Sequence, residues 1–203
     1  MVVTTPPLYL KHTTTKNTLF RLFLKKKRTP GDLELISFIV KKFGYRPKNL
    51  KLFEQALTHK SYSNTKNNVE SNERLEFLGD TVIDLIVAEY LYEKFPEKDE
   101  GFLTKVKAKI VNRNMLSSIG AEIELAKQIR YKTGRSIRIA TIEGNAFEAV
   151  IGALYLDSDY ETTKKIYTSR IIRTYVNLNK VLEQEIDFKS DLLIWGQRSK
   201  LEV

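Results

Sequence analysis

Residues Asn72–Asp80 read NERLEFLGD, and residues Gly144–Glu148 read GNAFE. In a helix, Glu73 lies three residues before Glu76, and Asp80 lies four residues after it, so the three carboxylates share one face. Like charges at this spacing destabilise an isolated helix by roughly 0.2–0.5 kcal/mol per pair. A solvated acidic face is one explanation. The apolar residues around the acids favour a buried helix, where uncompensated charge is costly, and therefore indicate a bound cation.

The second motif places Asn145 and Glu148 three residues apart, again on one face of an apolar helix. Gly144 and the alanines beside it would allow a neighbouring helix to approach closely. Carboxylate and amide oxygens presented by two facing helices suit Mg²⁺ or Mn²⁺ rather than zinc. The chain has no cysteine and only two histidines, His12 and His59. The sequence therefore offers few residues for a histidine-based mechanism, and His59 is interpreted as a helix-end or packing residue.

Helical periodicity continues through almost the whole chain from Gly31 onward. It predicts helices at about residues 33–43, 50–58, 73–94, 103–119, within 122–131, and at 145–156 and 160–177. Asp32 suits the start of the first helix, and the Asn-rich residues 64–71 form a loop by composition. No convincing alternating strand pattern occurs. The expected fold class is all-α.

Composition limits the class of protein and its partners. The 203 residues are 42% hydrophobic, which is typical of a globular chain with a buried core. Charges interrupt every apolar stretch well before 18 residues, so no membrane span is expected. The net charge of +9 favours a polyanionic partner, of which nucleic acid is the commonest.

Four motifs in sequence order resemble the catalytic domain of ribonuclease III. They are QALTHKSY at Gln55–Tyr62, NERLEFLGD at Asn72–Asp80, EGFLTK at Glu100–Lys105 and GNAFEAVIGALYLDS at Gly144–Ser158. The resemblance covers about residues 33–176. It implies an all-helical, magnesium-dependent endonuclease that forms a two-fold homodimer, cuts double-stranded RNA and leaves 5′-phosphate and 3′-hydroxyl ends. Manganese is the expected substitute for magnesium, and processing of ribosomal and other RNAs is the expected role.

The resemblance also implies roles for single residues. Asp80 and Glu148 match the catalytic acids, and the metal-binding set is Glu76, Asp80, Asn145 and Glu148. Glu73 and Glu100 match acids near the cleavage site whose role is less central. Phe77 and Gly79 match the dimer interface. Most family members carry Asp where this chain has Asn145, which keeps a carbonyl oxygen but removes one negative charge. The expected result is an active enzyme with weaker magnesium affinity than an Asp would give.

Basic residues near these motifs are candidates for contacts with the RNA backbone. They are Lys105, Lys107, Lys109, Arg130, Lys132, Arg135 and Arg138. For any one of them, a solvated helix face or loop explains the charge equally well.

The two ends of the chain differ from the body. Residues 1–31 carry a basic extension with no acid before Asp32. A basic arm touching RNA is favoured over an amphipathic helix or a mitochondrial transit peptide; the expected location is the bacterial cytoplasm. Residues 32–176 form the expected catalytic domain and 177–186 a linker. Residues 187–203 resemble the first helix of a double-stranded-RNA-binding domain, which would be incomplete here.

Two other functions compete with the endonuclease. The first is an RNA-binding or ribosome-associated protein of the same fold that has lost catalysis, which the transit-like leader and Asn145 favour. The second is a metal-dependent nucleotide phosphohydrolase, for which paired acidic helices would also serve. The retained acids Glu76, Asp80 and Glu148 argue against the first, and the basic charge argues against the second.

Overall fold

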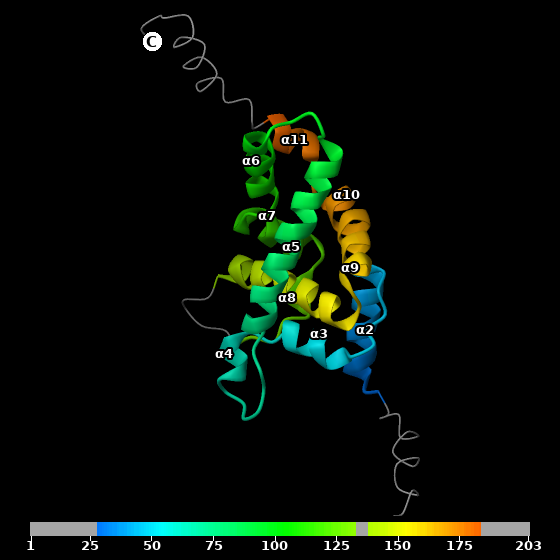
Figure 1. The fold of residues 1–203 in the computed structure, drawn as a ribbon. Coiled ribbons are helices and arrows are strands. Elements are labelled where there is room, and N and C mark those ends of the chain that lie inside the picture. Colours follow the sequence, from blue (N-terminus) through cyan, green and yellow to red (C-terminus); the bar gives the residue numbers. More distant parts are fainter. Residues whose placement is uncertain (1–27, 133–137, 184–203) are drawn as a thin grey trace, which may run out of the picture.

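The structure, a computed structural model, describes residues 28–132 and 138–183 (Figure 1). Within these residues it consists of helices and connecting loops, with one isolated bridge between Thr58 and Arg130 and no strand. The all-α prediction is confirmed. The helices are α2 (Pro30–Phe43), α3 (Leu50–Ala56), α4 (Lys60–Ser63), α5 (Glu73–Lys94), α6 (Glu100–Ile110), α7 (Arg113–Glu122), α8 (Ile139–Asp157), α9 (Tyr160–Ile166), α10 (Arg173–Tyr175) and α11 (Leu178–Glu183). A 3₁₀ turn, η1 (Leu125–Lys127), and a π-helical turn, η2 (Tyr167–Ile172), complete the described elements.

Helix α8 is the central element, and it crosses α5 in the middle of the molecule (Figure 1). It packs mainly against α5 and α7, and most of its residues are buried. Among the described helices, α8 alone is long and apolar enough to cross a membrane. However, 61% of its apolar window is buried within the domain, as expected of a core helix.

Two glycines set the distance between α5 and α8. A Cβ atom at Gly79 would lie 1.8 Å from the carbonyl oxygen of Glu148, and one at Gly152 would lie 2.3 Å from the carbonyl oxygen of Leu75. Neither position can hold a side chain without moving a backbone. The two helices are therefore in main-chain contact. Gly144 makes a similar approach to α7, where its Cβ would lie 2.9 Å from the Ser117 Oγ.

Helix α5 occupies the predicted residues 73–94, but the prediction of one helix over 103–119 was wrong. The chain breaks at residues 111–112, and Asn112 caps the new helix α7 by accepting a hydrogen bond from the Met115 N–H at 2.9 Å. Helix α8 begins at Ile139, six residues before the predicted start, which places Asn145 and Glu148 well inside a helix. Asp32 takes part in the predicted cap, in a reciprocal pair of hydrogen bonds with Thr29.

Some predictions lie partly or wholly outside the described residues. These are most of the basic extension at residues 1–31, Arg135, and the RNA-binding-domain helix at residues 187–203. Of the predicted linker at 177–186, the structure describes the part that contains α11. This helix packs against α6, and Val181 is 4% exposed. The division of the chain into domains stays a prediction.

Candidate active site

The close crossing of α5 and α8 brings the two acidic motifs together. Glu76 and Asp80 lie one helical turn apart on α5, on either side of Gly79, which contacts the backbone of Glu148 on α8. Glu76 and Glu148 are half-buried, as is Asn145 one turn earlier on α8, while Asp80 is exposed. Four of the residues predicted to form a metal site are thus brought to one place by two helices in main-chain contact.

The electrostatics of this cluster show an excess of negative charge. The pKa of Glu148 is raised to about 7, mainly by burial and in addition by the negative charges of Asp80 and Glu76. Burial also raises the pKa of Glu76, with added repulsion from Glu73 and Asp80. Buried acids that oppose each other's ionisation are a common feature of functional sites.

Two groups oppose this repulsion. Asn145 is hydrogen-bonded through its side chain to the carboxylate of Glu76, which lowers the pKa of that acid. Arg113, the first residue of α7, lowers the pKa of both Glu76 and Glu148 through its charge. Arg113 was not among the predicted site residues. The only local signal was the Asn112-Arg113 pair, since Asn is a favoured helix-capping residue.

The residues fit a hard divalent cation by the chemistry of their donors. Three carboxylates and one amide oxygen are the ligand types that Mg²⁺ and Mn²⁺ prefer. Among residues 28–132 and 138–183, no three His, Asp or Glu side chains stand close enough together to hold an ion as they are arranged. A cation at this site would therefore require the side chains to draw closer, which the exposure of Asp80 permits.

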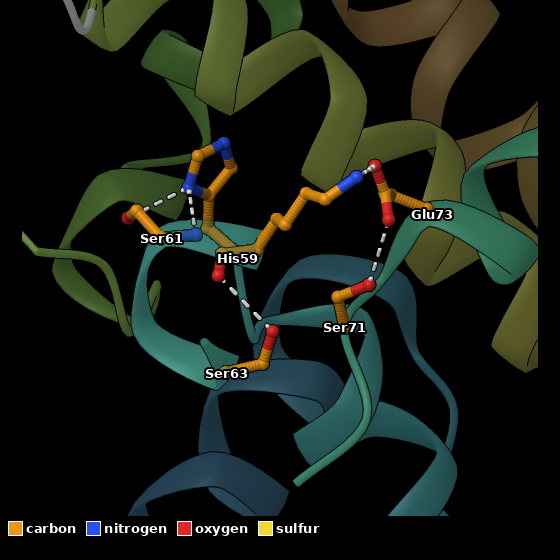
Figure 2. A network of polar contacts seen from close by, with 6 residues as sticks. His59, Ser61, Ser63, Ser71 and Glu73 are labelled. Atoms are coloured by element: carbon orange, nitrogen blue, oxygen red, sulfur yellow. Dashed lines mark hydrogen bonds and ion pairs between the residues drawn. The ribbon is translucent and has the colours of Figure 1, made fainter. Parts of the chain in front are cut away.

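Glu73 is held in a polar network beside the cluster (Figure 2). Its carboxylate accepts a hydrogen bond from Lys60 Nζ at 2.8 Å and another from Ser71 Oγ at 3.2 Å. The hydrogen bond from Lys60 is the main cause of its lowered pKa. In the same network His59 caps α4, because its Nδ1 accepts the Ser61 N–H at 3.1 Å. The interpretation of His59 as a helix-end residue is confirmed.

The structure does not bring Glu100 into this cluster. Glu100 is exposed at the start of α6, where it accepts a hydrogen bond from Thr104 at 2.8 Å. It lines a separate, mainly apolar pocket with Leu85 and Tyr92, and it is not among the groups that shift the pKa of Glu76 or Glu148.

The candidate RNA-binding residues fall into two groups. Lys105, Lys132 and Arg138 are exposed, whereas Lys109 is half-buried. Lys107 and Arg130 are already engaged within the chain: Lys107 pairs with Asp84 at 2.9 Å, and Arg130 donates to the Glu54 carbonyl at 2.8 Å.

The two residues predicted at a dimer interface occupy different environments. Phe77 is 77% exposed on α5, so its aromatic ring is available to a second molecule. Gly79 is buried against α8 within the same chain and presents no surface to a partner. Its place in the fold is explained by the helix crossing, and the expectation of an interface rests on Phe77.

Comparison with known proteins identifies the family. The profile described as Ribonuclease-III-like matches residues 49–175. The chain is 45% identical over 174 residues to Ribonuclease 3 of Bacteroides fragilis and 46% identical over 162 residues to Ribonuclease 3 of Bacteroides thetaiotaomicron. These matches cover 85% and 79% of this chain, but only 60% and 52% of the relatives.

A solved structure agrees with these matches. The nuclease domain of ribonuclease III from Campylobacter jejuni, which contains a region involved in dimer formation, is 36% identical with a TM-score of 0.61. The match covers 69% of this chain and 98% of that domain. The chain belongs to the ribonuclease III family.

Proposed function

We propose that this chain is an endoribonuclease that hydrolyses double-stranded RNA with the help of a bound divalent cation, Mg²⁺ or Mn²⁺. The observation that carries the proposal is the meeting of Glu76, Asp80 and Glu148 at the crossing of α5 and α8, with the pKa of Glu148 raised to about 7. A cation is the simplest group that balances this charge. Family membership and the net charge of +9 support RNA as the substrate.

The chain's own residues have distinct roles in this proposal. Glu76, Asp80 and Glu148 hold the cation, and Asn145 adds its amide oxygen while its amide N–H groups face Glu76. When bound, the cation supplies an acidified water and charge neutralisation at the phosphate. Arg113 lies near Glu76 and Glu148 and adds a second positive charge at the place where the phosphate would lie. Hydrolysis by water would leave 5′-phosphate and 3′-hydroxyl ends.

We further propose that the active form is a homodimer. Phe77, Leu85 and Tyr92 are exposed on α5, with 77%, 55% and 73% of their surfaces accessible. Their spacing of eight and seven residues places them within about 80° around the helix axis. Beside them lies the apolar pocket of about 910 Å³. An apolar face of this kind suits an isologous interface with a second copy, as a two-fold axis requires.

The relatives reported above come from bacteria, which supports a bacterial cytoplasmic enzyme that processes ribosomal and other RNAs. The chain spans about half to three fifths of their length, and how the chain finds its substrates is part of the proposal. A second candidate, an inactive RNA-binding member of the family, is favoured by the presence of Asn145.

The test is a cleavage assay with duplex RNA, single-stranded RNA and free nucleotides, each with Mg²⁺ or with a chelator. The expected result is cutting of the duplex alone, only with the cation, and its loss by about 100-fold or more in Asp80→Asn and Glu148→Gln. Glu161→Gln changes an exposed acid on α9 that is not among the groups that shift the pKa of Glu76 or Glu148; it is the matched control and keeps full activity. Binding of the duplex without cutting favours the inactive candidate instead, and release of phosphate from nucleotides favours the phosphohydrolase.

A further inference from the structure

A second, polar pocket of about 360 Å³ lies next to the acid cluster, between α4 and the start of α5. Its lining residues are His59, Lys60, Ser61, Asn64, Asn72, Glu73, Glu76 and Asn145. Two of these, Glu76 and Asn145, also belong to the candidate active site. A nucleotide whose phosphate lies at the acids would therefore have its neighbouring groups within reach of the rest of the pocket.

The segments that form this pocket are tied together through their backbones. The Asn72 N–H donates to the Thr58 carbonyl at 2.9 Å, and the His59 N–H donates to the Arg130 carbonyl at 3.0 Å. The Lys60–Glu73 ion pair closes one wall (Figure 2). The pocket is thus fixed before any ligand arrives, as expected of a binding site.

Asn72 lines the pocket and carries a side-chain donor that has no partner among the described residues. The residue is only 1% exposed, yet its side-chain Nδ2 has no hydrogen-bond partner among the described residues. It does not cap α5, although it occupies the N-cap position. Leaving a buried amide donor unpaired is unfavourable, and such a group usually has a ligand or a functional reason.

His59 brings a second donor. Its Nδ1 accepts the Ser61 N–H, so the neutral ring carries its hydrogen on Nε2. The Ser61 Oγ, which accepts the Lys132 N–H at 3.0 Å, lies 2.9 Å from the same Nδ1, and with the hydrogen on Nε2 this contact is a bond from the hydroxyl to Nδ1. Figure 2 shows the other ring nitrogen of His59 on the side away from these bonds.

The charge of the pocket excludes a phosphate as the natural occupant. The lining contains the carboxylates of Glu73 and Glu76 against the single ammonium of Lys60, which Glu73 already binds. The donors on Asn64, Asn72 and His59 are neutral. A ligand here must accept from these donors, offer a proton to a carboxylate and carry no negative charge. A hydroxyl group meets all three conditions.

We infer that this pocket binds the 2′-hydroxyl of a ribose beside the scissile phosphate, with Asn72 Nδ2 and His59 Nε2 donating to the hydroxyl oxygen and Glu76 accepting its proton. The inference rests on the proposed endoribonuclease activity and names what would make that site select RNA over DNA. The 2′-hydroxyl is the group that differs between the two, and it is both donor and acceptor.

The test uses a duplex RNA with one defined cleavage site and a set of variants in which a single nucleotide near that site is 2′-deoxy or 2′-fluoro. The expected result is one position at which 2′-deoxy lowers kcat/KM of the natural chain about tenfold, since a buried donor is left unpaired. At the same position a 2′-fluoro substituent, which cannot donate a proton, does not restore the full kcat/KM of the all-ribose substrate. In Asn72→Ala, the all-ribose and 2′-deoxy substrates are cut at nearly equal rates.

The readout is the ratio of kcat/KM for the all-ribose substrate to kcat/KM for the 2′-deoxy substrate, both measured with one protein preparation. A partial loss of folded protein lowers both values equally and leaves this ratio unchanged. His59→Asn is the second variant, because Asn still caps α4 by accepting the Ser61 N–H but is too short to present a donor at the Nε2 position. It should lose discrimination in the same way. Asn67→Ala, an exposed Asn outside the pocket, is the matched control and keeps the natural ratio.

The outcomes separate the two proposals. If the natural chain cuts duplex RNA but no single 2′-deoxy position slows it, the pocket does not bind a 2′-hydroxyl. The same conclusion follows if such a position exists but the ratio is unchanged in both Asn72→Ala and His59→Asn, or if both variants slow all substrates equally, as a phosphate contact would. A natural chain that cuts no duplex with any divalent cation overturns the endoribonuclease proposal and this inference with it.

Discussion

Asn145 on α8 donates a side-chain hydrogen bond to the carboxylate of Glu76 on α5 and thereby lowers the pKa of that acid. An Asp at this position would present an oxygen instead, and the donor would be replaced by a fourth negative charge. The Asn therefore stabilises the cluster in the absence of metal, at the cost of one charged ligand. This relationship gives a physical meaning to the departure from the family pattern.

Asn145→Asp should strengthen the binding of metal and destabilise the metal-free cluster. We expect the Mg²⁺ concentration for half-maximal cleavage to fall about tenfold, because ligand charge strengthens the binding of hard cations. We also expect the metal-free variant to melt at a lower temperature than the natural chain, because the acids then repel each other more. Titration of Mg²⁺ in the cleavage assay and thermal melting in chelator measure the two effects. An inactive natural chain that Asp restores would instead identify an inactive family member.

Glu148 should make the metal-free protein less stable as the pH rises. Its pKa of about 7 in the folded chain exceeds its ordinary value of 4.5, so the folded state binds more protons than the unfolded state between these values. The stability is therefore unaffected below about pH 4.5, falls as the pH rises through 7, and stays reduced above it.

Melting in chelator at pH 5 and pH 8 checks this expectation. Between pH 5 and pH 8 the melting temperature of the natural chain should fall about 3 °C further than that of Glu148→Gln, because Gln does not ionise. Added Mg²⁺ should raise the melting temperature at pH 8 more than at pH 5. Equal pH dependence in both proteins would show that Glu148 titrates at its ordinary pKa.

Gly79→Ala should destabilise the fold strongly. The new Cβ would lie 1.8 Å from the Glu148 carbonyl oxygen, and relief requires α5 and α8 to move apart. We expect a loss of about 3 kcal/mol or more in the free energy of unfolding, measured by denaturant titration. Gly101→Ala on α6 is the control, because its Cβ would lie 3.7 Å from the nearest atom. That variant should be as stable as the natural chain or slightly more so.

Phe77→Ala should weaken self-association without harming the fold. The side chain is 77% exposed, so little core packing is lost within one chain. We expect the dimer dissociation constant to rise at least about tenfold, as for an aromatic residue at the centre of an interface. Sedimentation velocity over a range of concentrations measures it. Leu33→Ala, 55% exposed on α2, should associate normally. Unchanged association in Phe77→Ala would place the interface elsewhere.

Lys105 and Lys107 should contribute unequally to RNA binding although both lie on α6. Lys105 is exposed with no ion pair among the described residues, whereas Lys107 pairs with Asp84. Lys105→Ala should reduce the slope of log affinity against log salt by about one, as the loss of one phosphate contact predicts. Lys107→Ala should change the slope less. Measurements on inactive Glu148→Gln protein avoid cleavage during the titration, and equal slopes would refute the distinction.

Much of the fold follows from the sequence because apolar spacing is strong in long helices. Helix α5 occupies its predicted residues 73–94. The break at Asn112 was missed, because apolar residues continue at helical spacing on both sides and neither Gly nor Pro marks it. The predicted start near residue 145 was six residues late, because the helix begins at Ile139. Gly144 does make the close approach to a neighbouring helix that the sequence predicted, since its Cβ would lie 2.9 Å from the Ser117 Oγ on α7.

The site was predictable where residues share one helix and not where separate helices meet. The spacing of Glu76 and Asp80 placed both on one face of α5, and the family resemblance brought Glu148 to them. Arg113 could not be found in this way, since only the tertiary fold brings the start of α7 near the acids. Glu100 was expected near the cluster but lies at the start of α6, because local sequence does not determine which face of the domain a helix end reaches.

The main-chain contact at Gly79 and Gly152 has a consequence for how such a protein can vary. In the proposed site, the separation between the backbones that carry Glu76 and Asp80 on α5 and Glu148 on α8 depends on two glycines rather than on the volumes of core side chains. Substitutions among the buried apolar residues can therefore change the melting temperature while leaving that separation unaltered. A spacer made of backbone thus lets the core sequence vary independently of the geometry of the proposed metal site.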